Sequence, residues 1–95
     1  MGRWRGSPYE YTLVGNDGPV LLFKTDLDAP RGRVIAIDLR RPEQEHWRVI
    51  IPEDKATLTG VTLVGNLLVA EYLDDVKTRV KLFTTDGRFV REIDF

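Results

Sequence analysis

The sequence of 95 residues contains no cysteine, one histidine and one serine. Without cysteine the chain has no disulfide, no thiolate zinc site and no thiol nucleophile. One histidine cannot form a site of several histidines within a single chain. No apolar run approaches the roughly 18 residues of a membrane span, and no segment resembles a signal peptide. We therefore expect a soluble protein without contact to a membrane, and the sequence assigns it to no compartment.

The sequence also lacks an excess of charge of either sign. Fourteen basic side chains stand against fifteen acidic ones, which gives a formal net charge of −1 and a pI near 5.8. A protein that binds nucleic acid by general electrostatic attraction needs a clear excess of lysine and arginine. Hydrophobic residues make up 42% of the chain, which is enough for a globular core. The length predicts one compact domain, and the balance of charges predicts that this domain does not bind nucleic acid.

The apolar pattern is typical of strands, because turn residues interrupt the chain every 8 to 12 residues or so. Residues 43–46 are polar and able to form one helical turn, which is too short to change the fold class. We expect eight strands, at residues 9–14, 20–25, 33–39, 47–51, 58–64, 67–73, 78–84 and 88–95. Turns are predicted at residues 15–18, at Gly65-Asn66 and at Asp86-Gly87.

The two halves of the chain share one order of strands and turns. Residues 12–16 (TLVGN) recur unchanged as residues 62–66. Each half has four expected strands, and a unit of 40 to 50 residues is typical of a propeller blade. We therefore predict an all-β fold of two four-stranded antiparallel blades. The first covers residues 9–54, the second residues 55–95, and residues 1–8 form an N-terminal extension.

Several strands are apolar at successive positions, for example residues 20–23, 34–37 and 67–70. An antiparallel sheet with one wet face would instead alternate apolar and polar residues. We therefore expect both faces of these strands to be buried, which requires neighbouring sheets on both sides. Two blades would leave two such faces unpaired.

The residues from Ala29 to Glu53 (APRGRVIAIDLRRPEQEHWRVIIPE) resemble the prolyl oligopeptidase family, and the resemblance extends over residues 9–95. The similar part is the β-propeller domain of that family, which lies over a catalytic α/β-hydrolase domain. The resemblance implies two adjacent blades of a seven-bladed ring that acts as a non-catalytic gate for peptides. The catalytic residues of the family lie on the hydrolase domain. The 95 residues contain no Gly-x-Ser-x-Gly motif, so the resemblance carries no peptidase activity over to them.

No individual side chain indicates a catalytic or ligand-binding site. His46 lies in a polar connection and is expected at the surface. Asp26 and Asp28, and likewise Asp74 and Asp75, follow the second strand of each unit; we expect turn carboxylates here and no calcium site. Four arginines bracket the third strand, and nearby acidic residues favour a mixed-charge surface over a phosphate site; they are Arg31, Arg33, Arg40 and Arg41. We assign no catalytic, cofactor or metal residue.

Two functions remain. The first is a non-catalytic structural module, excised or engineered from a propeller, that associates with copies of itself through its blade faces. Cyclic trimers or tetramers would then supply six or eight blades. The alternative is an engineered protein-binding scaffold that uses surface aromatics, with Arg3, Trp4, Tyr9 and Tyr11 as its interface.

Overall fold

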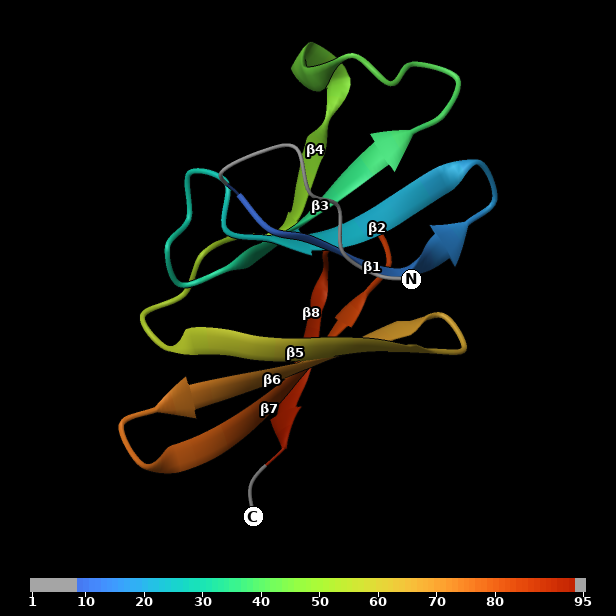
Figure 1. Cartoon of the computed structure of the whole chain (residues 1–95). Coiled ribbons are helices and arrows are strands. Elements are labelled where there is room, and N and C mark those ends of the chain that lie inside the picture. The colour runs from blue at the N-terminus through green and yellow to red at the C-terminus, as the bar shows by residue number, and fades with distance from the viewer. Residues whose placement is uncertain (1–8, 94–95) are drawn as a thin grey trace.

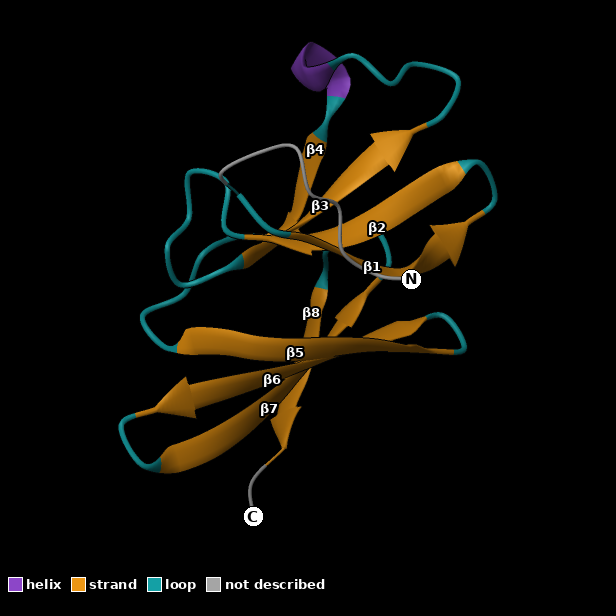
Figure 2. Ribbon diagram, viewed as in Figure 1, coloured by secondary structure: helices purple, strands orange, loops and turns teal. Residues whose placement is uncertain are grey.

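The computed structural model describes residues 9–93, which form eight strands in two four-stranded sheets (Figures 1 and 2). The first sheet contains β1 (Tyr11–Asp17), β2 (Val20–Thr25), β3 (Arg33–Asp38) and β4 (Arg48–Ile51). A single 3-10 turn, η1 (Gln44–His46), precedes β4. The second sheet contains β5 (Thr57–Val64), β6 (Leu67–Asp74), β7 (Lys77–Thr84) and β8 (Phe89–Ile93).

Strand order within each sheet follows the sequence, and every neighbouring pair is antiparallel. No strand of one half enters the sheet of the other half within the described residues. The two sheets lie one above the other, and residues 52–56 connect them (Figure 1). The prediction of two blade-like antiparallel units is confirmed.

The first strand and its turn differ from the prediction. β1 begins at Tyr11 instead of residue 9, and it continues to Asp17, where we expected a turn. Leu13 pairs with Phe23 and Gly15 pairs with Leu22, so Val14 is an extra residue in a β-bulge. The bulge shifts the remaining strand, and the hairpin turns at Gly18-Pro19 between the paired residues Asp17 and Val20. β2 has its predicted bounds, and β3 to β7 each differ from theirs by one residue at one end. β8 begins one residue later than predicted, at Phe89, and residues 94–95 of its predicted range lie outside the described part.

The repeated pentapeptide does not mark equivalent positions. Gly65-Asn66 forms the β5–β6 turn, whereas Gly15 and Asn16 belong to the β1 ladder and pair with Leu22 and Leu21. The equivalent turns are therefore Gly18-Pro19 and Gly65-Asn66. The structural repeat therefore lies in the order of the strands. The prediction that the two copies of the pentapeptide occupy equivalent positions in the two sheets was wrong.

The core lies between the two sheets. Alternate residues of β2 and β3 point from the first sheet toward the second, and alternate residues of β6 point back. These inward-facing surfaces, called the inner faces below, share one cluster of buried side chains. Its members include Leu22, Val34, Ala36, Ile50, Ile51, Leu58, Leu68, Ala70, Tyr72 and Phe83.

Close backbone approaches fix how the sheets stack. A Cβ atom on Gly15 would lie 2.7 Å from Leu63 Cδ2, so glycine lets β1 and β5 come together. The β7–β8 hairpin rests on β4 through Gly87. The Leu58 amide donates a hydrogen bond of 2.7 Å to the Arg31 carbonyl oxygen. These contacts tie the hairpins of one sheet to the strands of the other.

Candidate functional site on the outer face of the first sheet

The face of the first sheet that points away from the second, called the outer face, is apolar but incompletely covered. Tyr11, Leu27 and Ile35 are buried there in a second hydrophobic cluster, separate from the core between the sheets. Ile35 is only 1% exposed, whereas Val49, its cross-strand neighbour on β4, is 49% exposed. The expectation that both faces would be buried therefore holds for the inner faces and fails at the rim of this outer face. The physical reason is that only one neighbouring sheet is present in the described residues.

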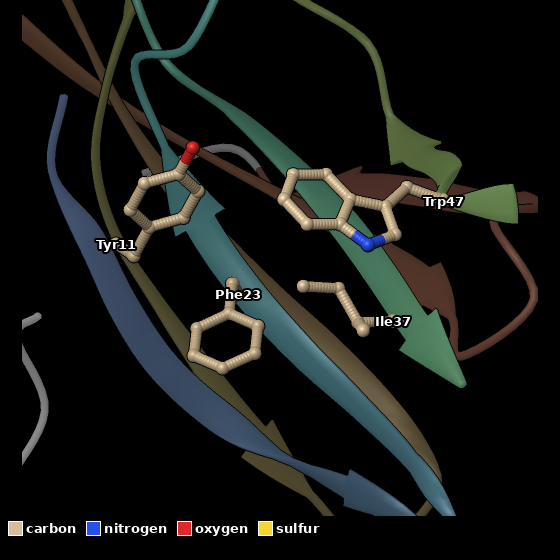
Figure 3. A pocket seen from close by; sticks show the side chains of 4 residues that line it. All are labelled: Tyr11, Phe23, Ile37 and Trp47. Carbon is tan, nitrogen blue, oxygen red and sulfur yellow. The ribbon is translucent and has the colours of Figure 1, made fainter. Parts of the chain in front are cut away.

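Four side chains of this face line a hollow of about 250 Å³, namely Tyr11, Phe23, Ile37 and Trp47 (Figure 3). They come from β1, β2, β3 and the residue before β4, so the hollow crosses the whole sheet. The Tyr11 ring meets both other aromatic rings edge-on. Its centroid lies 6.4 Å from that of Phe23, at an interplanar angle of 87°, and 6.2 Å from that of Trp47, at 79°. Edge-to-face packing of this kind favours a fixed arrangement of the rings.

The hollow offers apolar contact and little hydrogen bonding. The Trp47 indole Nε1–H donates to the Pro42 carbonyl oxygen over 2.8 Å, so its polar atom is already used within the chain. The other lining groups are phenyl, sec-butyl and phenol side chains. Such a surface suits aliphatic or aromatic side chains of another molecule or segment better than a polar ligand.

A buried cationic atom lies on the same face. Arg33 pairs with Thr25 across β2 and β3, and Thr25 pairs with Tyr11, so the three share the outer face. The Arg33 Nε atom is buried and has no hydrogen-bond partner among the residues that the structure describes. A buried guanidinium donor without an acceptor is costly. The outer face is therefore apolar, with one guanidinium nitrogen at its edge that lacks a hydrogen-bond acceptor among the described residues.

The predicted interface residues do not come together as one surface. Arg3 and Trp4 lie outside the described residues. Tyr11 lines the aromatic hollow, but Tyr9 precedes β1 and lines a different depression beside Asp26, Asp28 and Pro30. The interface of Arg3, Trp4, Tyr9 and Tyr11 stays a prediction. The structure adds Phe23 and Ile37, which the sequence signalled only through the double-sided apolar pattern of β2 and β3, and Trp47, which directly precedes β4.

The other candidate groups lie in turns. The His46 Nε2 atom is 3.8 Å from Glu43 Oε1 and 3.7 Å from Glu45 Oε2, in the connection to β4. Asp28 and Asp75 occupy turns with positive φ angles of 54° and 57°, as carboxylates in turns often do. No three histidine, cysteine or carboxylate side chains gather into a metal-binding group within residues 9–93. The described part of the chain also has no helix long and apolar enough to cross a membrane.

Comparison with known proteins gives a consistent result. The family model of the prolyl oligopeptidase N-terminal beta-propeller domain matches residues 5–95. A prolyl endopeptidase of Elizabethkingia miricola is 32% identical over 81 residues, which are 85% of this chain and 11% of that protein. A dual function macrocyclase-peptidase of Galerina marginata is 38% identical over 80 residues, again 11% of its length.

Solved structures agree with these matches. A structure from a comparison of two prolyl endopeptidases superimposes with a TM-score of 0.88 at 32% identity, over 97% of this chain and 14% of that chain. The prolyl oligopeptidase B of Galerina marginata, as apo protein, gives a TM-score of 0.83 at 32% identity, over 94% of this chain and 13% of that one. The 95 residues therefore span about one eighth of these peptidases, and they correspond to the propeller portion and not to a catalytic domain.

Proposed function

The chain belongs to the prolyl oligopeptidase N-terminal β-propeller family, and we propose that it acts as a non-catalytic structural segment, two consecutive blades of a propeller. In a complete ring the segment would form part of the wall that controls the access of peptides to a peptidase. An excised or engineered origin stays a prediction from the sequence.

One observation carries this proposal: the outer face of the first sheet is built like a core, and residues 9–93 cover it only in part. Ile35 is as deeply buried there as the residues between the sheets, and an aromatic hollow lies beside it. The two sheets already stack face to face through their inner faces. A further blade stacked in the same way would cover the hollow and the exposed rim.

The side chains support a role without catalysis. His46 is the one histidine in the sequence, and within the described residues it faces only the two glutamates of its own turn. The one serine, Ser7, lies outside the described residues. Nucleophilic catalysis by a serine requires a base within hydrogen-bond reach, itself oriented by a third group. Residues 9–93 contain no such arrangement.

A graft tests the structural role directly. Residues 9–93 would replace the matching segment of the Elizabethkingia miricola prolyl endopeptidase, and cleavage of a fluorogenic peptide with an internal proline would be measured. We expect the chimera to purify as a folded protein that retains cleavage, while the isolated chain cleaves nothing above buffer. A folded chimera without cleavage would contradict the wall-forming role. Saturable turnover by the isolated chain would contradict the absence of catalysis.

A further inference from the structure

The outer face of the second sheet is apolar and aliphatic, unlike the aromatic outer face of the first. The ladders of β5 and β6 place Val64, Leu67, Val69 and Leu73 on it. Val64 is 58% exposed and Leu73 is 45% exposed, which is unusual for two large aliphatic side chains on one sheet face. Protruding aliphatic side chains are what a hollow lined by aromatic rings and Ile37 can accept.

Glu71 on the outer face of the second sheet and Arg33 on that of the first carry opposite charges, while Arg91 adds a positive charge on the β8 edge of the second sheet. Glu71 lies in the middle of the outer face of the second sheet, between its cross-strand neighbours Gly60 and Val80, and is exposed. It is the acidic residue of that face within the described strands. Arg33 is the basic residue on the strands of the other outer face, and its buried Nε atom lacks an acceptor among the described residues. Arg33 as a whole is half-buried, so a carboxylate from a stacked sheet would pair with the exposed part of its guanidinium and not with the covered Nε atom.

The surface beside Glu71 is also open. A Cβ atom on Gly60 would meet no atom within 4 Å. A guanidinium that approaches Glu71 from an opposing sheet therefore meets no side chain at this position. Gly60 has no positive φ angle, so its side-chain position is free for substitution.

From these observations we propose that the chain binds a second copy of itself, the outer face of the first sheet of one copy packing on the outer face of the second sheet of the next. Arg33 of one copy then pairs with Glu71 of the neighbour, and aliphatic side chains around Glu71 fill the aromatic hollow. This inference rests on the proposed structural role, because it extends the stacking seen between the two sheets within one copy.

Each copy carries one face of each kind, so the contact is heterologous. Copies continue to add until the stack closes into a ring. Propellers typically contain four to eight blades. With two sheets per copy, a closed dimer, trimer or tetramer would contain four, six or eight sheets, all within that range.

Sedimentation velocity of the full chain over a concentration series tests the proposal. We expect species two to four times as heavy as the 10.9 kDa single copy. Glu71→Arg places two arginines opposite each other and should weaken association at least tenfold, and Arg33→Glu should do the same with two glutamates. A mixture of the two variants restores opposite charges wherever unlike copies meet, which is at every contact of an alternating ring with an even number of copies and at two of the three contacts of a trimer, and it should associate again. Lys55→Glu, a charge reversal in the linker between the sheets, is the matched control and should associate like the parent.

A second variant covers the case in which Arg33→Glu, at a half-buried position, fails to fold. Gly60→Lys fills the open space and places an ammonium group in register with Glu71 of the same sheet. It should weaken association as Glu71→Arg does, with the circular dichroism spectrum unchanged. A folded parent that sediments as a single copy at all concentrations would overturn the proposal, as would association that Glu71→Arg and Gly60→Lys leave unchanged. Either result would leave the graft experiment, and hence the structural role, unaffected.

Discussion

Gly87, in the β7–β8 hairpin of the second sheet, lies directly against the carbonyl oxygen of Ile50, on β4 of the first sheet. A Cβ atom at Gly87 would come within 2.6 Å of that oxygen, and the residue has a φ angle of +97°. Both the backbone angle and the contact therefore require glycine. The hairpin of one sheet can rest on the edge strand of the other only because no side chain separates them.

Gly87→Ala should destabilise the protein by about 2 kcal/mol or more, because it adds a backbone clash to the strain of a positive φ angle. Gly18→Ala is the matched control. Gly18 has a φ angle of +61° but nothing within 4 Å of its Cβ position, so we expect a loss of only about 1 kcal/mol. Urea unfolding followed by circular dichroism measures both. Equal losses would show that the hairpin does not rest on β4.

The ion pair between the linker and β7 predicts a dependence of stability on pH. Lys81 Nζ lies 2.7 Å from Asp54 Oδ2, and this hydrogen bond lowers the pKa of Asp54 below its ordinary value of 3.8. The folded state therefore favours the ionised carboxylate, and this contribution is present above about pH 4 and lost as the pH falls through the lowered pKa.

Asp54→Asn should lower the free energy of unfolding by about 1 kcal/mol at pH 7, a value between those for exposed and buried charged pairs. The difference in stability between the variant and the parent should shrink below pH 4. Asp38→Asn is the control. The Arg40 hydrogen bond lowers the pKa of Asp38 to about 2, but this pair lies at the surface of one sheet and is screened by solvent. Thermal unfolding of both variants from pH 2.5 to 7 gives the comparison. A loss at pH 7 that persists unchanged at low pH would contradict a role for the Asp54 charge.

The core between the sheets predicts unequal effects for two leucines of β6. Leu68 is fully buried on the inner face, so Leu68→Ala should cost about 2–5 kcal/mol. Leu73 lies half exposed on the outer face, and Leu73→Ala should cost less than about 1 kcal/mol. Both are measured in the Glu71→Arg background, where association is expected to be weak. A larger loss of stability in Leu73→Ala than in Leu68→Ala would contradict the assignment of the core to the inner face.

Two consecutive residues of β3 test the opposite faces of the first sheet. Ala36 is buried against the second sheet, so Ala36→Lys should abolish cooperative unfolding or cost more than about 3 kcal/mol. Ile37 lines the open hollow, and the Ile37→Lys protein should stay folded because the ammonium group of the new lysine reaches water. Near-ultraviolet circular dichroism and urea unfolding report the difference. Loss of the fold in Ile37→Lys alone would refute the assignment of faces.

Much of this architecture could be predicted from the sequence. Turn residues at regular spacing gave the strand order, and consecutive apolar residues in β2, β3 and β6 indicated sheets in a stack. The bulge at Val14 could not be foreseen, because nothing in residues 12–16 distinguishes a turn from a continued strand. Proline at position 19 has a fixed negative φ, and after the flexible Gly18 it is the local signal that favours the later turn.

The candidate site was predictable only in part. Tyr11 was expected on an open face, but its partners depend on the register of four strands. Trp47 joins Tyr11 and Phe23 because η1 and the Pro42 carbonyl oxygen hold its indole over the sheet. Likewise, the complementarity of Arg33 and Glu71 depends on which face each strand position occupies. A one-residue change of register reverses that assignment, so the sequence pattern alone does not determine it.

The most direct test of the stacking of the two sheets within one copy is an NMR measurement on the Glu71→Arg variant, which is expected to be monomeric. Nuclear Overhauser contacts would be sought between the α protons of Gly15 and the methyl groups of Leu63, since β1 and β5 approach most closely there. We predict these contacts, together with amide contacts across strands that stay within each half of the chain. Their absence, with strands of the two halves paired in one ladder, would contradict the account.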